Sequence, residues 1–595
     1  MRNPLFLSVL ILAGCQKDQD DGQETGDSTL GAPTYYEDIA PILSENCSVC
    51  HNPDGLMPGL LFDDAETTSI LAGAIQGAVA TGSMPPFFGV ESDECENPWG
   101  FEDDPRLEPG DRDLIAAWAA AGGPTGNVED AVSLPGPKNG TLEGSDMEIF
   151  PNGKHTTAAA GAVEDEFICF SIDPGLTAQQ WLEGFAVLAD DLGVVHHVLA
   201  GIDHEGTTGT LADPETGIYD CFGGFGDIEA TFIGGWIPGA SPIEFPDHSG
   251  VRMEAGSRIV LQMHYHLVDE PRTDGTGIAL RFAENTPVQP AILTLLGNSG
   301  SQTSSGDGLQ PGENDLGGDP IFYIPANEEA HTETMQYHPW TGLPREMYSF
   351  LIANHMHYVG DDMRVRVERG PNAPTDEDDI CLLHTPEWDY AWQQFYKYDA
   401  STGNAPVLYP GDALILECTF NNTLSNPALQ KALDEAGEEE PIDVSLGNGT
   451  LDEMCIVVAG WVFEIPVTVE GETHTGSSDN TLSFPNNNSA PCTGPAGFAL
   501  NSEGVVNGAS ACGLDFNDQL ITVEYSFSGT VEAATNEAAG TVQIDVLYLE
   551  DSLTLDWTGS VDGDNLSLSF SGSGVFSNID VLFESTVNVD LVSAE

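Results

Sequence analysis

The sequence predicts a multidomain, mainly β protein with one small helical domain near its N-terminus. The chain has 595 residues, which is too many for a single hydrophobic core. Residues 34–125 carry apolar side chains at helical spacing. From about residue 150 to 465, short β-branched and aromatic runs alternate with clusters of Gly, Pro, Asn and Asp. Residues 466–595 alternate apolar and polar positions, a pattern typical of antiparallel strands.

The composition is strongly acidic, with 96 acidic residues against 16 basic ones and a formal net charge of −80. The acidic residues are spread along the whole chain, which favours a solvated coat over an acidic interaction tail. Such a surface repels phosphates and anionic lipid headgroups. We therefore expect no nucleic-acid partner and no membrane binding through the polypeptide itself.

Residues 1–14 have the pattern of an export signal: Arg2, an apolar stretch over 5–12, and small residues after it. Leu12-Ala13-Gly14-Cys15 also resembles the bacterial lipobox, in which the cysteine is lipidated. A plain signal peptide or a short buried helix is the alternative. Residues 15–33 form a polar, flexible tether, and no later stretch reaches the ~20 apolar residues of a membrane span. We expect a lipoprotein on the periplasmic or cell-surface side, touching the membrane only through the Cys15 lipid.

Cys47-Ser-Val-Cys50-His51 matches the motif for covalent attachment of a c-type haem. In that motif two thiols add to the haem vinyl groups and the adjacent histidine ligates the iron. Met84 lies in a proline-stiffened loop and is the expected sixth ligand, with Met57 or a histidine elsewhere as alternatives. A disulfide beside an incidental histidine is the competing interpretation of the motif.

Helical signals surround this motif. Thr34 and Glu37 form a capping box that starts a helix before it, and a closing helix is expected over 111–121. The pattern predicts a small all-α, cytochrome c-like domain over residues 34–125 that holds one covalent haem c. A linker rich in Gly, Pro and Ser follows over residues 126–149.

The chain has 11 cysteines, and an exported protein keeps its disulfides. The lipid and the haem motif account for three of them, which leaves an even eight. Sequence alone does not decide whether Cys95 and Cys381 pair. We predict three other pairings, namely Cys169 with Cys221, Cys418 with Cys455, and Cys492 with Cys512.

Scattered histidines and one methionine indicate soft-metal chemistry. His355 and His357 stand two apart in an apolar run, so on a strand both project from one face and can chelate one metal. The adjacent His196 and His197 can share a metal only if their strand ends, bends or bulges. Either pair alone is more typical of surface or core histidines. A thioether such as that of Met454 favours Cu(I), so a site that uses it is a copper site.

The order of these segments resembles that of the copper type II, ascorbate-dependent monooxygenases. That family includes peptidylglycine α-hydroxylating monooxygenase and dopamine β-monooxygenase. The matching segments are residues 190–199, 260–265, 355–357 and 451–455, and the resemblance covers roughly residues 150–465. The predicted cysteine pairs Cys169–Cys221 and Cys418–Cys455 match the family as well.

The resemblance implies two tandem jelly-roll-like β-sandwich domains, over residues 150–290 and 291–465, each with one copper. The first copper transfers electrons and the second binds oxygen and is catalytic. The implied activity inserts one atom of O2 into a substrate C–H bond, releases the other as water, and consumes two electrons from ascorbate or another reductant. The implied ligands are His196, His197 and His264 for the first copper, and His355, His357 and Met454 for the second.

Two features go beyond the family pattern. The attached haem domain suggests an internal donor that passes electrons to the three-histidine copper, replacing or supplementing ascorbate or an external donor. Ala353, Ile456 and Val458 stand where the peptidylglycine enzyme has polar substrate-binding residues. A buried substrate carboxylate would stay unpaired there, so a neutral or apolar organic substrate is expected. His266, next to the ligand segment, is interpreted as a bystander.

Other interpretations remain beside the monooxygenase. A non-enzymatic copper and haem protein for electron transfer or copper storage is the main one, and intact Met454 argues against it. A zinc hydrolase lacks a carboxylate base at helical spacing from the histidines. The aromatic-rich stretch 382–398 is interpreted as packing core rather than pocket wall. Residues 466–595 are expected to form a β-sandwich, with a barrel as the alternative, serving as an accessory or a structural module.

Overall fold

The computed structural model describes residues 32–591 with short gaps, so the predicted export signal, Cys15 and most of the tether lie outside the described residues. Within the described part, no helix is long and apolar enough to cross a membrane. The gaps are residues 54–56, 91, 93, 137–140, 162–164, 222–223, 313–314, 316–318, 340–344, 376–377, 391, 402, 450, 464–472, 486–488, 517–518, 548–551 and 577–578.

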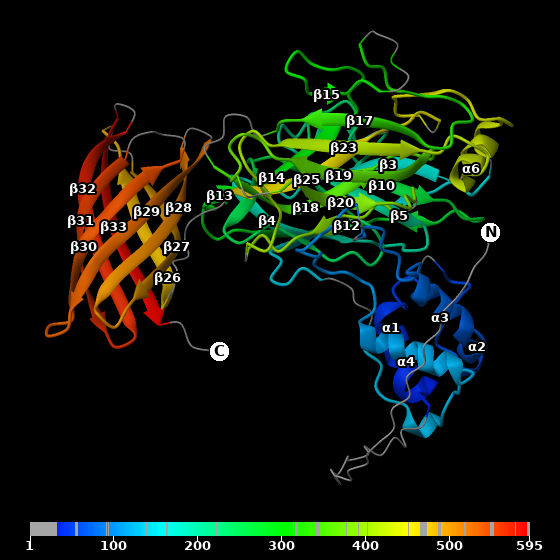
Figure 1. Cartoon of the computed structure of the whole chain (residues 1–595), viewed down its shortest axis with the longest axis horizontal. Coiled ribbons are helices and arrows are strands. Elements are labelled where there is room, and N and C mark those ends of the chain that lie inside the picture. Colours follow the sequence, from blue (N-terminus) through cyan, green and yellow to red (C-terminus); the bar gives the residue numbers. More distant parts are fainter. Residues whose placement is uncertain are drawn as a thin grey trace, which may run out of the picture.

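The chain forms a helical domain, two β bodies and a barrel (Figure 1). Strand accounts for 45% of the structure and helix for 11%, which confirms the mainly β prediction. The helical domain (residues 34–130) hangs below the paired β bodies, and the barrel (residues 474–591) lies at their opposite end (Figure 1). The first β body spans residues 147–290 and the second spans 292–463.

The helical domain is built around a small apolar core. The closing helix predicted over 111–121 is α4, and it buries Ile115 and Trp118 completely. Thr34 caps the first helical turn, but its N–H donates to the carboxylate of Asp38 at 2.7 Å, so the predicted capping box with Glu37 does not form. The helical elements are η1 (Tyr35–Ile39), α1 (Ala40–Asn46), α2 (Ala65–Ile70), α3 (Ala72–Thr81), α4 (Pro109–Ala120) and η2 (Val128–Asp130).

The first β body consists of two sheets whose facing side chains share one core. One sheet has the order β1 (Met147–Ile149), β12 (Gly277–Phe282), β4 (Gln180–Leu188), β9 (Ser249–Met253) and β13 (Gln289–Pro290), with β8 (Ile243–Glu244) on β4. The other has the order β6 (Ile218–Tyr219), β3 (Asp165–Ile172), β10 (Arg258–His266), β5 (Val195–Asp203) and β7 (Thr231–Trp236). The pair β2 (His155–Thr156) and β11 (Thr273–Asp274) and the short helix α5 (Thr208–Leu211) complete it.

The second β body repeats this two-sheet arrangement. One sheet has the order β14 (Ile292–Gly297), β25 (Ile456–Phe463), β18 (Met347–His355) and β21 (Tyr396–Lys397), with β22 (Val407–Leu408) on β18. The other has the order β15 (Gly308–Leu309), β17 (His331–Tyr337), β23 (Ala413–Phe420), β19 (Gly360–Glu368) and β20 (Ile380–Thr385). The pair β16 (Tyr323–Ile324) and β24 (Val444–Ser445) and the helix α6 (Pro427–Ala436) lie outside these sheets.

Strand β25 joins the two β bodies through its alternating faces. All eight of its residues are buried. Val457, Ala459 and Trp461 pack in the core of the second body, whereas Val458 and Val462 pack in the core of the first. Because successive strand side chains point to opposite faces, one apolar strand serves two cores. The two bodies therefore hold the sites they carry in a fixed relation.

The C-terminal part is a closed barrel, so the predicted β-sandwich is wrong. The first strand, β26, pairs with the last, β33, over ten residues, which removes both sheet edges. Alternation of apolar and polar residues is the same in a sandwich and in a barrel, so the pattern could not separate them. The interior is filled by aromatic side chains such as Phe498, Tyr525 and Trp557. The strands are β26 (His474–Ser483), β27 (Ser489–Leu500), β28 (Val505–Phe516), β29 (Gln519–Glu532), β30 (Glu537–Val546), β31 (Ser552–Asp562), β32 (Asn565–Phe576) and β33 (Ile579–Leu591).

Four disulfides hold the described chain. The three predicted pairs, Cys169–Cys221, Cys418–Cys455 and Cys492–Cys512, are confirmed. A fourth bond joins Cys95 to Cys381, a pairing that the sequence left open. Disulfides persist in oxidising compartments, which indicates an extracellular or periplasmic protein.

The Cys95–Cys381 bond also fixes the helical domain to the second β body. The chain after α3 runs along this body, and the Val90 N–H donates to the His384 carbonyl at 3.0 Å. The Glu102 N–H donates to the Lys397 carbonyl at 2.8 Å. A covalent bond and backbone hydrogen bonds therefore set the position of the helical domain against the second β body.

Candidate functional site

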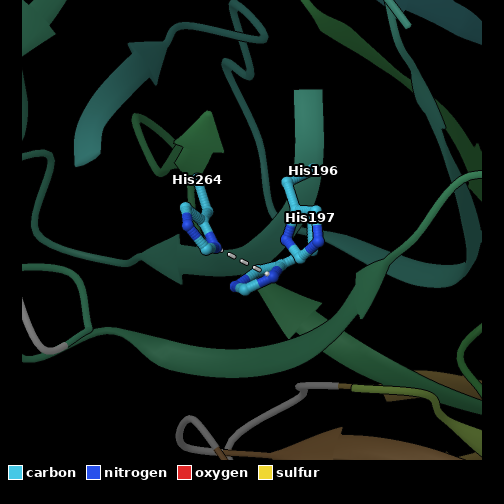
Figure 2. A group of neighbouring side chains, drawn as sticks. All are labelled: His196, His197 and His264. Atoms are coloured by element: carbon cyan, nitrogen blue, oxygen red, sulfur yellow. Dashed lines mark hydrogen bonds between the residues drawn. The ribbon is translucent and has the colours of Figure 1, made fainter. Parts of the chain in front are cut away.

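Three predicted ligands, His196, His197 and His264, meet on the first β body (Figure 2). His197 on β5 lies directly opposite His264 on β10. The next pair in the register is Val195 with Tyr265, so His196 is an extra residue on β5 and forms a bulge. This irregularity lets two adjacent histidines turn to the same site, as the sequence required.

The three imidazoles offer unprotonated nitrogens to a common point. One ligand atom from each lies within 4.8 Å of the others, and the Nδ1 atoms of His197 and His264 are 3.2 Å apart. Burial lowers the pKa of His196 to about 3 and holds the pKa of His197 and His264 below the ordinary value. The buried Nδ1 of His196 has no hydrogen-bond partner. An unpaired buried nitrogen facing two others fits a metal ligand set.

Asp165 on β3 orients one of these ligands. The Nε2–H of His264 donates to its carboxylate at 3.0 Å, which leaves the Nδ1 of His264 free for a metal. Burial alone would raise the pKa of Asp165, but hydrogen bonds from His264 and His266 outweigh it and hold this pKa well below its usual range. Carboxylate–histidine–metal triads have this form. His266 donates to the same carboxylate at 3.3 Å and is not one of the three clustered histidines.

His355 and His357 come together on the second β body. Strand β18 ends at His355, so His357 follows in irregular chain rather than on the expected strand, yet the two ring centroids are 5.3 Å apart. The Nδ1–H of His355 donates to the Gln393 side-chain oxygen at 2.7 Å, and that of His357 donates to the Asp452 carbonyl at 3.0 Å. Both Nε2 atoms are therefore left unprotonated. Burial lowers the pKa of His355 to about 3 and also lowers that of His357.

A buried carboxylate ties Met454 to this histidine pair. Glu453 is fully buried, and its Oε1 accepts the backbone N–H groups of both His357 and Met454, the latter at 2.8 Å. Its Oε2 accepts the N–H of Val359 at 3.2 Å. The neighbouring Cys455 is bonded to Cys418 on β23. The backbones of two predicted ligands therefore share one acceptor, although they are 97 positions apart in the chain.

The haem motif lines a cavity of about 600 Å³ in the helical domain. Cys47 and Cys50 are free thiols on its wall, whereas the other described cysteines are paired. The Nδ1–H of His51 donates to the Leu60 carbonyl at 2.9 Å, which leaves Nε2 for a metal. Met84 also lines the cavity and is 41% exposed. These donors suit a covalent haem.

Met57 lines the same cavity, so the choice of sixth ligand between it and Met84 stays open. The cavity is closed by residues of both β bodies as well. Gly235 and Ile237 come from the first body, and Trp392 and Phe395 come from the second. This cavity therefore lies where the helical domain meets the two bodies that carry the histidines.

The stretch 382–398 does more than pack a core. Tyr396 is buried in the core as expected, but Trp392 and Phe395 are pocket wall, which corrects the prediction. The Tyr390 ring centroid lies 6.4 Å from that of His264 and 6.2 Å from that of His357, so one side chain stands between the two histidine sites. The aromatic content of this stretch alone could not distinguish residues that line a pocket from residues that pack in a core.

The three positions that argued against a substrate carboxylate are buried. Ala353 and Val458 are partners across β18 and β25 and pack in the core that the two bodies share. Ile456 is paired with His355 and is 7% exposed. These apolar side chains offer neither a charge nor a hydrogen-bond donor to a substrate carboxylate.

Comparisons with known proteins assign no family. No protein-family model matches this sequence, and no curated protein is detectably similar to it. Two solved structures of transferrin binding protein B from Haemophilus parasuis Hp5, a double and a single mutant, match at 8% and 9% identity with a TM-score of 0.15 each. They cover 57% and 58% of this chain and 49% and 51% of their own, so this chain spans about half their length. A likeness this weak carries no argument about fold or function.

Proposed function

We propose that this chain is an exported, haem-coupled copper monooxygenase that hydroxylates a C–H bond of a neutral or apolar substrate with O2. The observation that carries the proposal is the bulged strand that brings His196, His197 and His264 together around an unpaired buried nitrogen. The likeness to copper type II, ascorbate-dependent monooxygenases in ligand order supports the choice of metal. So does the presence of a methionine beside the second histidine pair.

The first site would hold its copper through three imidazoles, and the second through His355, His357 and Met454. Bound copper supplies one-electron redox chemistry at the first site and activation of dioxygen at the second. Asp165 and Gln393 fix the tautomers of His264 and His355, so each ligand is ready without a proton rearrangement. Glu453 holds the backbones of His357 and Met454 together.

The helical domain would act as the internal electron source. Its cavity would hold a haem through thioether bonds at Cys47 and Cys50, and His51 and Met84 would be the ligands of its iron. A bound haem supplies a reversible one-electron store. The cavity walls are mainly apolar, and residues of both β bodies form part of them, which supports a role in passing electrons to those bodies.

The apolar surroundings of Ala353 and Val458 support a neutral or apolar substrate, since an ionised group buried there would lack a partner. Lipid attachment at Cys15 is part of the same proposal and would keep the enzyme on the outer side of a membrane. An external reductant, ascorbate or another electron donor, would reduce the haem again after each transfer.

Oxygen consumption with reductant tests the activity. The unaltered protein is expected to consume O2 and to form a hydroxylated product from an apolar test substrate, and Met454→Ala is expected to abolish both. His338→Ala is a matched control, because this histidine of the second body lies at the end of β17 and donates to Asp307 at 2.7 Å. Equal product formation by the Met454 variant, or none by the unaltered protein with both metals bound, would contradict the proposal and favour a non-enzymatic electron-transfer protein.

A further inference from the structure

One segment of the second β body touches the haem cavity and both histidine sites. We call Tyr390 and residues 392–395 the bridging segment. Trp392, Gln394 and Phe395 line the cavity. Tyr390 lies between His264 and His357. Gln393, in the middle of the segment, is hydrogen-bonded to His355.

Gln393 is the most direct of these connections. Its side-chain oxygen accepts from the Nδ1 of His355 at 2.7 Å, and its side-chain N–H donates to the Tyr390 carbonyl at 3.1 Å. The second bond fixes which end of the amide faces the histidine. On the other side, the Gln394 amide donates to the Pro86 carbonyl at 3.2 Å, beside Met84 in the cavity wall. One peptide unit, the Gln393 side chain and one hydrogen bond therefore connect the cavity wall to the His355 ring.

We propose that Gln393 is the electron-transfer link between the haem cavity and the second metal site, so that electrons enter at His355 rather than at the three-histidine site. This inference rests on the proposed function. Gln393 is a positioning residue in this scheme: it holds the His355 ring and supplies the hydrogen bond through which the haem and the metal are coupled.

The backbone route to the three-histidine site through β7 and β5 is longer. Gly235 of β7 lines the cavity and pairs with Leu199 of β5. An electron on this route crosses the hydrogen bonds between β7 and β5 and then follows two residues of backbone to His197. The route through Gln393 crosses only one hydrogen bond, which joins the Gln393 side chain directly to the His355 ring.

The proposed step moves one electron and no atoms. Ferrous haem is oxidised to ferric haem while one cupric ion at the second site is reduced to cuprous. No covalent bond forms or breaks, and no proton is exchanged. Tyr390, which stands between His264 and His357, then offers a contact between the two metal sites for the second electron.

The test follows the haem directly, without substrate or oxygen. Holoprotein with ferric haem and cupric copper is flashed with a photoexcited flavin donor, which reduces the haem, and the decay of ferrous haem absorbance reports onward transfer. Freeze-quenched samples give the copper signal by electron paramagnetic resonance. Gln393→Leu is expected to slow the decay by about 10-fold or more, by analogy with the loss of metal affinity or activity when a ligand's hydrogen-bond partner is removed.

Two controls accompany this variant. Gln393→Glu keeps an acceptor for His355 and is expected to restore a decay close to that of the unaltered protein. Gln310→Leu removes another half-buried glutamine of the second body, bonded to the Gly306 and Gly308 carbonyls at 2.9 Å, and is expected to change nothing. Copper and haem contents are measured on every sample.

His264→Ala identifies the receiving metal and does not depend on the stability of the Gln393 variants. Without the three-histidine copper, ferrous haem is still expected to decay and the remaining cupric signal to disappear. Loss of the decay in this variant, or an unchanged decay in Gln393→Leu, would overturn the inference while leaving the proposed function intact. Protein that binds no copper or no haem would overturn both.

Discussion

Replacement of Glu453 is expected to damage the second metal site through the backbone. Its carboxylate accepts three backbone N–H groups, two of which belong to the predicted ligands His357 and Met454 and the third to Val359. Burial raises the pKa of Glu453 to about 8, although these N–H groups lower it in turn. The side chain is fully buried, so bulk water does not reach these N–H groups in the folded chain.

The magnitude follows from the hydrogen bonds lost. Glu453→Ala leaves three buried donors without an acceptor, and at about 1 kcal/mol or more for each the local structure loses at least about 3 kcal/mol. Glu453→Gln keeps an oxygen for His357 and Met454 and loses only the Val359 bond, so about 1 kcal/mol is expected. Because the freed N–H groups belong to two ligands, copper affinity at this site is expected to fall about 10- to 100-fold in the alanine variant.

Hydrogen–deuterium exchange of the copper-free protein measures the local part of this effect. Peptides that cover residues 353–360 and 452–458 are expected to exchange faster in Glu453→Ala, with a smaller change in Glu453→Gln. Glu387→Gln, an exposed carboxylate of the same body, serves as control and is expected to stay within about 0.5 kcal/mol of the unaltered protein. Unchanged exchange together with unchanged copper affinity in the alanine variant would refute the role assigned to Glu453.

Three further predictions concern the other parts of the chain. Cys50→Ala is expected to leave a single thioether attachment, seen as a shifted pyridine haemochrome band, and an unshifted band would contradict the haem assignment. Asp165→Asn is expected to weaken copper binding at the three-histidine site about 10- to 100-fold, since His264 loses its charged partner; chelator competition measures this, and equal affinity would refute it. Removing the Cys95–Cys381 bond by a double serine substitution is expected to cost about 2–4 kcal/mol, read as earlier thermal unfolding, and an unchanged transition would show that the backbone contacts suffice.

Local chemistry and residue order made part of this molecule predictable. The alternating runs indicated a mainly β chain, and the buried Ile115 and Trp118 of α4 could be found from helical spacing alone. Of the predicted cysteine pairs, Cys492–Cys512 joins the paired strands β27 and β28, and Cys418–Cys455 links β23 to the residue before β25 in the other sheet of the second body. The need for a bulge at His196 followed from strand geometry, because adjacent side chains point to opposite faces.

Contacts made by residues without a distinctive pattern could not be predicted. Asp165 is one of many acidic residues, and nothing in the sequence marks it as the partner of His264. Gln393 stands in an aromatic stretch whose composition fits packing core as well as it fits a pocket wall. The barrel depends on closure between β26 and β33, a pairing between strands about a hundred residues apart that period-2 alternation does not encode.

Metal and haem content per chain tests the central claim most directly. The unaltered protein, purified after expression with copper and haem attachment available, is expected to hold two copper ions and one covalent haem. His196→Ala and Met454→Ala are each expected to lose one copper and keep the haem. Zinc in place of copper, copper that survives both substitutions, or a chain without covalent haem would contradict the account.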